Sequence, residues 1–366
     1  MTTRRNFLKG GTAAATGIVF CSCGLLQSAH AQPAGSRTLP VSIGGKRVKT
    51  IDVHAHCHFR EAGALLPADQ AAAAQLPPVN GAAEAFIEID KRLAAMDAQA
   101  VDMEVLSINP FWYGRERDLA AQIVKVQNEK LAELCASKPD RFAAFASLTL
   151  QAPDLAVTEL ETAVKKQGLK GAAIGGMVNG VEFSDTRFHP VWAKAEELGV
   201  PLFIHPQGVG ELSKRLSGNG WLGNTIGNPL ETTIALSHLI FEGTLDKFPG
   251  LKVIAAHGGG YLPSYADRSD HACMVGPRGC NAEVKLKKKP TEYLKQLYFD
   301  SLIFSPEAIR HLAAQVGASQ IVLGSDYPYP WQLKPVDHIF ASASLSDEEK
   351  ANVLGNTAAR LLNIKA

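Results

Sequence analysis

At residues 50–56 the chain reads TIDVHAH, a short and largely apolar stretch that ends in two histidines. Seven further short apolar stretches follow it, and most are apolar without alternation. Strands that are covered on both faces of a parallel sheet have this character. We therefore predict eight buried strands, at residues 50–53, 101–108, 142–148, 169–174, 200–204, 251–256, 297–301 and 321–323.

Segments with the apolar spacing of helices separate these strands. Strand and helix alternate eight times, which predicts an α/β fold of parallel strands joined by right-handed crossovers. Eight such strands close into a (β/α)₈ TIM barrel, and an open doubly wound sheet is the alternative. Ser346 and Glu349 predict a capping box at the start of the last helix. The predicted helices are 84–98, 116–137, 154–167, 189–198, 230–247, 263–273, 306–316 and 346–362.

One connection is longer than the others. Residues 58–81 follow the first strand and contain an alanine run, Pro77-Pro78 and Asn80-Gly81. Connections of this length are uncommon in compact domains and are often functional. The carboxyl end of a barrel strand is also where active sites of this fold are built. We therefore predict an insertion over the pocket, within a barrel domain that spans residues 48–366.

The N-terminus predicts an export signal. Arg4-Arg5 precedes an uncharged stretch of small and apolar residues, and Ala29-His30-Ala31 offers a cleavage site. This arrangement resembles a twin-arginine signal, so we expect a signal at residues 1–31, an extension at residues 32–47 and a periplasmic location. A membrane anchor is the alternative, but the apolar stretch is short and interrupted by glycines.

Composition and charge narrow the class of partner. Loss of the signal would remove three positive charges and no acid, which takes the formal net charge from +1 to −2. A near-neutral balance argues against nucleic acid or an anionic membrane surface as a partner, and we expect no stable membrane span. Four cysteines remain after cleavage. Cys273 and Cys280 are close enough in sequence to pair, and two free thiols are equally compatible with the sequence.

Histidine and aspartate residues stand at the ends of four predicted strands. His54 and His56 are two residues apart, so both side chains project to the same side of the first strand. His205, His257 and Asp326 follow the fifth, sixth and eighth strands. The carboxyl ends of all barrel strands face one pocket, which should bring these side chains together. Imidazoles and a carboxylate with one open position are typical of a catalytic metal site.

This pattern resembles the signature of the amidohydrolase superfamily. Longer motifs are similar to the branch that contains aminocarboxymuconate-semialdehyde decarboxylase, and the resemblance runs from about residue 51 to residue 362. The three glycines after His257 are expected to leave room for the imidazole and the substrate. These motifs are QAPDLAV at 151–157, GNPLETT at 227–233, FPGLK at 248–252, HGGG at 257–260 and GSDYP at 324–328.

The resemblance implies one divalent metal ion, usually Zn²⁺, and non-oxidative decarboxylation of a small aromatic or unsaturated carboxylic acid. Carried over by position, the metal ligands are His54, His56, His205 and Asp326. His257 is then the catalytic acid/base, with Asp326 as the next catalytic candidate. The branch also contains hydrolases, so the alternative is a metal-dependent hydrolase such as a lactonase, in which metal-activated water attacks a carbonyl. A non-catalytic metal-binding protein would not need His257.

The sequence departs from this branch where the substrate carboxylate is held. The muconate-semialdehyde enzyme has an arginine ahead of the first barrel helix for this purpose, whereas residues 76–86 contain none here. Another cation near the rim should take its place, and Arg60 closely follows the two histidines. Arg60 is therefore the candidate for substrate binding. The expected partner is a small-molecule carboxylate, and assembly as a homodimer is left open.

If Arg4-Arg5 directs export, replacing both arginines by lysine should leave the precursor in the cytoplasm, because twin-arginine transport depends on this pair. Cell fractionation with immunodetection measures the distribution, and Arg37→Lys, outside the signal, is the matched control. Unchanged periplasmic delivery of the double variant would count against a twin-arginine signal.

Overall fold

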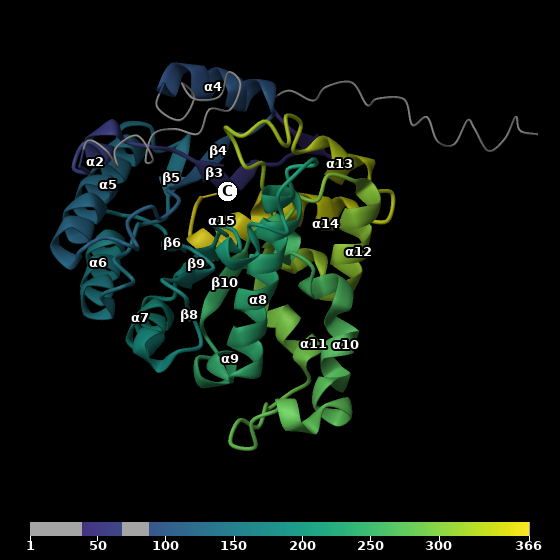
Figure 1. Ribbon diagram of the computed structural model, residues 1–366. Helices are drawn as coiled ribbons and strands as arrows, with labels where there is room; N and C mark the ends of the chain where they lie inside the picture. The colour runs from purple at the N-terminus through teal and green to yellow at the C-terminus, as the bar shows by residue number, and fades with distance from the viewer. Residues whose placement is uncertain (1–38, 68–87, 366) are drawn as a thin grey trace, which may run out of the picture. The chain divides into compact units, whose positions relative to one another are not determined.

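The computed structural model describes residues 39–67 and 88–365, and its described part contains the predicted strands (Figure 1). Each of the eight predicted strands overlaps an observed one. In chain order these are β3 (Ile51–His56), β4 (Met103–Ser107), β5 (Phe142–Ala144), β6 (Ala172–Ile174), β9 (Pro201–Ile204), β10 (Lys252–Ala255), β11 (Leu297–Asp300) and β12 (Ile321–Val322).

The strands are parallel and close into a barrel. β3, β4 and β5 form one sheet, and β6, β9, β10, β11 and β12 form the other. Parallel bridges join the sheets at both edges, between Asp52 and Leu323 and between Ala146 and Ala172. The predicted TIM-barrel architecture is therefore confirmed. Two short antiparallel hairpins lie outside the barrel, β1 (Ser42–Ile43) with β2 (Lys46–Arg47) and β7 (Met177–Val178) with β8 (Val181–Glu182).

The helices lie around the strands in chain order (Figure 1). The predicted helix 230–247 is divided, because Gly243 adopts a left-handed φ of 74° between α8 and α9. The main helices are α4 (Ile89–Ala98), α5 (Arg117–Ser137), α6 (Pro153–Lys165), α7 (His189–Leu198), α8 (Asn228–Phe241), α9 (Thr244–Lys247), α10 (Leu262–Val275), α11 (Pro290–Tyr293), α12 (Pro306–Val316) and α13 (Asp337–Ala341).

The predicted helix 346–362 consists of three consecutive helical segments. It begins with α14 (Asp347–Ala351), where Ser346 and Glu349 form the predicted capping box. The wider turn η9 (Asn352–Asn356) and α15 (Thr357–Leu362) follow. The start of the predicted insertion contains the short helix α2 (Arg60–Gly63). Its remainder, residues 68–81, lies outside the described residues, as do the predicted signal and residues 32–38 of the extension.

The barrel interior forms an apolar core of its own. It contains fully buried side chains from many strands, including Val53, Phe145 and Phe203. Ala358 and Leu362 of α15 belong to the same core. Because η9 lies against the residues that precede β3, α15 closes the amino end of the barrel. The last helix thus supports the barrel from the end at which the strands begin.

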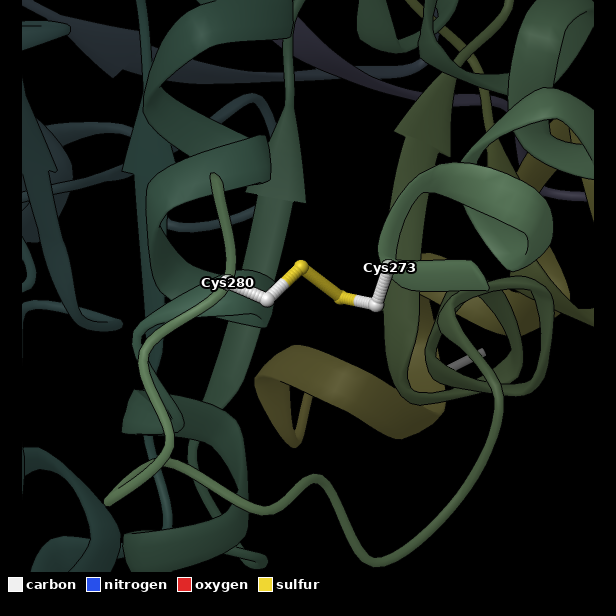
Figure 2. The surroundings of a disulfide bond; sticks show 2 residues. All are labelled: Cys273 and Cys280. Atoms are coloured by element: carbon white, nitrogen blue, oxygen red, sulfur yellow. A yellow bond between two sulfur atoms is a disulfide. The ribbon is translucent and has the colours of Figure 1, made fainter. Parts of the chain in front are cut away.

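A disulfide joins Cys273, near the end of α10, to Cys280, with the Cα atoms 5.7 Å apart (Figure 2). The 3₁₀ helix η6 (Pro277–Gly279) lies between the two cysteines. The pairing that the sequence left open is therefore formed, and it closes a short excursion between α10 and α11. Among residues 39–67 and 88–365, no helix is both long enough and apolar enough to cross a bilayer.

Gly355 lies where η9 closely approaches the segment that precedes β3, so a substitution there tests this packing. A Cβ at this position would lie 1.8 Å from the carbonyl oxygen of Lys49. Alanine in place of a helical glycine normally stabilises by about 0.5–1 kcal/mol, but here we expect Gly355→Ala to destabilise by about 1–3 kcal/mol through overpacking. Thermal unfolding measures the change in Tm.

Gly114→Ala is the matched control for this variant, because a Cβ at Gly114 would meet no atom within 4 Å. Its Tm should change little. A Gly355→Ala protein that is as stable as the unmodified chain would contradict close packing of η9 on the segment before β3.

Candidate metal centre

The structure brings together the four residues that the sequence predicts as metal ligands. His54 and His56 lie in β3, two residues apart, and both are buried. His205 directly follows β9, and its backbone N–H continues the strand ladder by donating to Ile174. Asp326 follows β12. One potential ligand atom from each of the four residues lies within 4.8 Å of the other three.

Hydrogen bonds at the far side of the rings turn both Nε2 atoms of β3 toward the centre. His54 Nδ1 lies 2.6 Å from Asp300 Oδ2, and His56 Nδ1 lies 3.2 Å from Ser107 Oγ. The two Nε2 atoms are 3.2 Å apart. Asp326 Oδ1 lies 3.2 Å from His54 Nε2 and 2.8 Å from His56 Nε2. The ring orientations are therefore fixed as a mononuclear site requires.

His205 provides the observation that indicates a bound ion. Both of its ring nitrogens are buried, and neither has a hydrogen-bond partner among the described residues. Buried polar side-chain atoms nearly always have a partner. Three imidazoles and one carboxylate with room for a further ligand form the donor set of a catalytic divalent metal. The residues present therefore fit one divalent ion.

The charges at the centre are strongly coupled. Burial lowers the pKa of His54, but the carboxylates of Asp326 and Asp300 outweigh it and raise this pKa to about 10. Burial raises the pKa of Asp326, yet the neighbouring imidazoles of His54 and His56 hold it well below its usual value. Burial and the other histidines lower the pKa of His205 well below its usual value. The centre therefore offers one carboxylate and at least one neutral imidazole to a cation.

Arg92 anchors the end of β3 from the outside. Its guanidinium is 1% exposed and donates to Glu104 of β4 at 2.5 Å, and it also donates to the backbone carbonyl of His56. The guanidinium lies over the ring of Tyr327, next to Asp326 in the chain, with 5.0 Å between its central carbon and the ring centroid. A buried and fully paired cation thus holds the two strand ends that carry ligands.

Asp300 is a site residue that the sequence reasoning missed. It is the last residue of β11, the seventh barrel strand, and is fully buried. Its Oδ2 atom accepts hydrogen bonds from His54 Nδ1 and, at 2.9 Å, from the backbone N–H of His257. Its Oδ1 atom accepts from the backbone N–H groups of Gly258 and Leu302. Its position at a strand end is the same signal that identified the ligands.

His257 lies beside the ligands and outside the four-residue cluster. It follows β10, and its Nε2 atom is 4.0 Å from Asp326 Oδ2. Its ring centroid is 5.2 Å from that of His54 and 5.5 Å from that of His205. Burial, aided by the positive charge of His54, lowers the pKa of His257 to about 4. A neutral imidazole at this position can accept or relay a proton next to the centre.

The glycines after His257 serve the packing of the turn. Gly260 has a φ of +65°, and a Cβ there would lie 2.1 Å from the carbonyl oxygen of Pro229 in α8. A Cβ at Gly259 would lie 2.5 Å from the ring of Phe299 in β11. The expectation that these glycines leave room for substrate is therefore corrected: they allow the turn to approach its neighbours in the barrel.

His205 and Asp326 line a cavity of about 410 Å³. Its other walls are mainly aromatic and amide side chains, namely Phe111, Trp221, Tyr329 and Trp331 with Asn109, Gln207, Asn224 and Asn228.

Arg60, the predicted substrate-binding residue, does not line this cavity. It is exposed on α2 and lines a separate hollow with Phe59 and Arg92. Its role in substrate binding stays a prediction.

Comparison with known proteins agrees with this geometry. Residues 51–364 match the amidohydrolase family. The chain is 32% identical to 2-amino-3-carboxymuconate-6-semialdehyde decarboxylase of Dictyostelium discoideum, over 75% of this chain and 76% of that protein. It is 30% identical to gamma-resorcylate decarboxylase of Rhodococcus jostii, over 75% of this chain and 87% of that protein.

A solved structure has the same fold. It is that of 5-carboxyvanillate decarboxylase from Novosphingobium aromaticivorans, complexed with manganese and 4-hydroxy-3-methoxy-5-nitrobenzoic acid. The TM-score is 0.78 at 23% identity, and the alignment covers 90% of this chain and all of that one.

His205→Ala should lose most of the bound metal, because it removes one of the four ligands from a mononuclear site. Inductively coupled plasma mass spectrometry of purified protein should find about one divalent ion per unmodified chain. His238→Ala is the control, because His238 is a partly exposed histidine on α8 that lies outside the cluster. Full metal content in His205→Ala would remove this residue from the site.

Asp300→Asn should weaken metal affinity about 10–100-fold, as loss of a carboxylate that orients a ligand histidine typically does. Competition with a chromophoric chelator measures the dissociation constant. Glu159→Gln is the control, because Glu159 is a half-buried carboxylate that accepts from Thr149 outside the cluster, and it should leave that constant nearly unchanged. Equal affinities for Asp300→Asn and the unmodified chain would show that His54 is oriented without Asp300.

Proposed function

Because the chain belongs to the amidohydrolase family, we propose that it is a divalent-metal-dependent carboxy-lyase. It removes CO₂ without oxidation from a small aromatic or unsaturated carboxylic acid. The observation that carries this proposal is the four-residue centre with His257 beside it, opening into a cavity with aromatic walls. Two relatives of at least 30% identity are named as decarboxylases of such acids, which favours this activity over the hydrolase alternative.

Different residues of the chain have different roles in this reaction. His54, His56, His205 and Asp326 would hold the ion, which supplies positive charge that orients the substrate and stabilises charge during the reaction. Loss of CO₂ breaks the bond between the carboxyl carbon and the substrate carbon, and it leaves the electron pair on the latter. That carbon then takes up a proton. His257, a neutral imidazole beside the centre, is placed to relay this proton from solvent water to the carbon.

Zn²⁺ is the ion that we propose, because imidazole nitrogens and carboxylate oxygens are among its usual protein ligands. The fold relative from Novosphingobium holds manganese in its crystal structure. Protein stripped with a chelator and reloaded separately with Zn²⁺ and Mn²⁺ distinguishes the two. Higher affinity and activity with Mn²⁺ would overturn the choice of zinc.

Export to the periplasm is part of the proposal. Disulfides persist in oxidising compartments such as the periplasm, and the pairing of Cys273 with Cys280 supports this location.

The activity itself is tested by product analysis. Metal-loaded protein is incubated with hydroxybenzoates, unsaturated acids and lactones, while CO₂ release and proton release are followed. Release of CO₂ with formation of the decarboxylated product is the expected result. Opening of a lactone without CO₂ release would establish the hydrolase instead.

His257→Asn should retain fold and metal but lose about 10²–10⁴ in kcat, because general acid–base catalysis is typically worth this factor. KM should change less, since the ligands and cavity walls remain. His238→Ala is the control for loss of a histidine. Loss of metal together with activity would make His257 a ligand. Unchanged kcat would make it structural, with Asp326 as the next candidate for the proton transfer.

A further inference from the structure

The cavity over the metal centre contains uncharged polar groups and no cation. Among the described residues that line it there is no lysine and no arginine, and Asp326 is its only acid. The side-chain amides of Asn109, Asn224 and Asn228 line the cavity. None of these three amides makes a hydrogen bond with a described residue. The lining therefore offers neutral donors and acceptors to a ligand.

The charge balance of the centre sets a limit on the ligand. A divalent ion carries two positive charges, Asp326 supplies one negative charge, and ligand imidazoles bind metals as neutral groups. One net positive charge remains, and one substrate carboxylate compensates it. A second carboxylate in the same cavity would have no lysine or arginine of the described lining as a partner, and even partial loss of its hydration without a partner is costly. Residues 68–87, which the structure does not describe, contain no lysine or arginine in their sequence.

The walls of the cavity also favour a flat ring. Trp221 and Trp331 stack on each other with ring centroids 5.1 Å apart and planes 21° apart. They come from two different connections, the one between β9 and α8 and the one after β12. Trp221 is 58% exposed and holds a left-handed φ of 51°. The stacked pair thus gives the cavity a planar apolar face, suited to an aromatic ring.

We infer that this site, if it is the carboxy-lyase proposed above, is specific for aromatic monocarboxylic acids with uncharged polar substituents on the ring. The single carboxylate lies at the metal, the ring lies along the aromatic walls, and hydroxyl, methoxy or amide substituents meet the asparagine amides. A ring with a second carboxylate is excluded by the lack of a cation. Asn224, which lines the cavity and whose backbone N–H donates to the carbonyl of Trp221, is the specificity-determining residue against such diacids.

The test compares two probes of the same shape that differ by one charge, 5-carbamoylsalicylate and 5-carboxysalicylate. Isothermal titration calorimetry measures their binding to metal-loaded protein, in the His257→Asn background so that turnover does not interfere. The amide should bind at least about 10-fold more tightly than the dicarboxylate, which corresponds to ~1.4 kcal/mol. Equal or tighter binding of the dicarboxylate overturns the inference and leaves the proposed function standing. If neither probe binds, the proposed function on aromatic acids fails as well.

Asn224→Arg in the same background tests the assignment of the residue. The added guanidinium supplies the missing cation, so the preference for the amide should fall or reverse. Asn224→Gln is the matched control, because it keeps a neutral amide, and it should keep the preference. A preference that stays the same in Asn224→Arg overturns the role of Asn224.

Discussion

Backbone hydrogen bonds between the first and last barrel strands set the position of the metal ligands. Val53 N–H donates to the carbonyl of Leu323 at 2.9 Å, and Asp326 N–H donates to that of His54 at 2.8 Å. These bonds close the barrel and place the Asp326 carboxylate against the imidazoles of β3. A shift of this pairing by one residue would turn His54 and His56 to the opposite face, and the centre would be lost.

Two residues at the rim of the barrel have a strained backbone, and hydrogen bonds hold each of them in place. Asp326 has a φ of 64° and His257 a φ of 57°, and a left-handed residue other than glycine costs about 1–3 kcal/mol. Asp326 is held by its bond to the His54 carbonyl, and His257 by its backbone bond to Asp300. The Asp300 carboxylate therefore accepts hydrogen bonds from both a ligand, His54, and the proposed acid/base, His257. The geometry for metal binding and the geometry for proton transfer depend on each other through this residue.

The sequence predicted the barrel and a rim that gathers histidines and an aspartate, because both follow from periodicity and position. The division into four ligands and His257 beside them was implied by the resemblance to the amidohydrolase superfamily. Continuous apolar stretches define strands, and a polar residue at the end of such a strand must face the rim. Asp300 satisfies the same condition, but an aspartate that contacts only a ligand histidine and backbone N–H groups has no motif of its own. For Arg60, closeness in sequence to the two histidines does not determine the direction of the chain after β3. Its side chain lines a different hollow.

Sequence patterns did not predict which distant segments contact each other. Glycine at position 260 is compatible with space for a substrate and with close backbone packing, and only the 2.1 Å approach to Pro229 decides between them. The last helix was predicted from its capping box and apolar spacing. Its position at the amino end of the barrel depends on which surface Ala358 and Leu362 meet.

In the proposed site, four strand-end residues hold one divalent ion, and His257 lies outside its coordination. X-ray diffraction from crystals of the metal-loaded protein, recorded on both sides of the metal absorption edge, tests this most directly. We expect one anomalous peak at about 2.0–2.2 Å from a nitrogen of His54, His56 and His205 and from an oxygen of Asp326, with His257 beyond bonding distance. A peak at another position, or one bonded to His257, would contradict it.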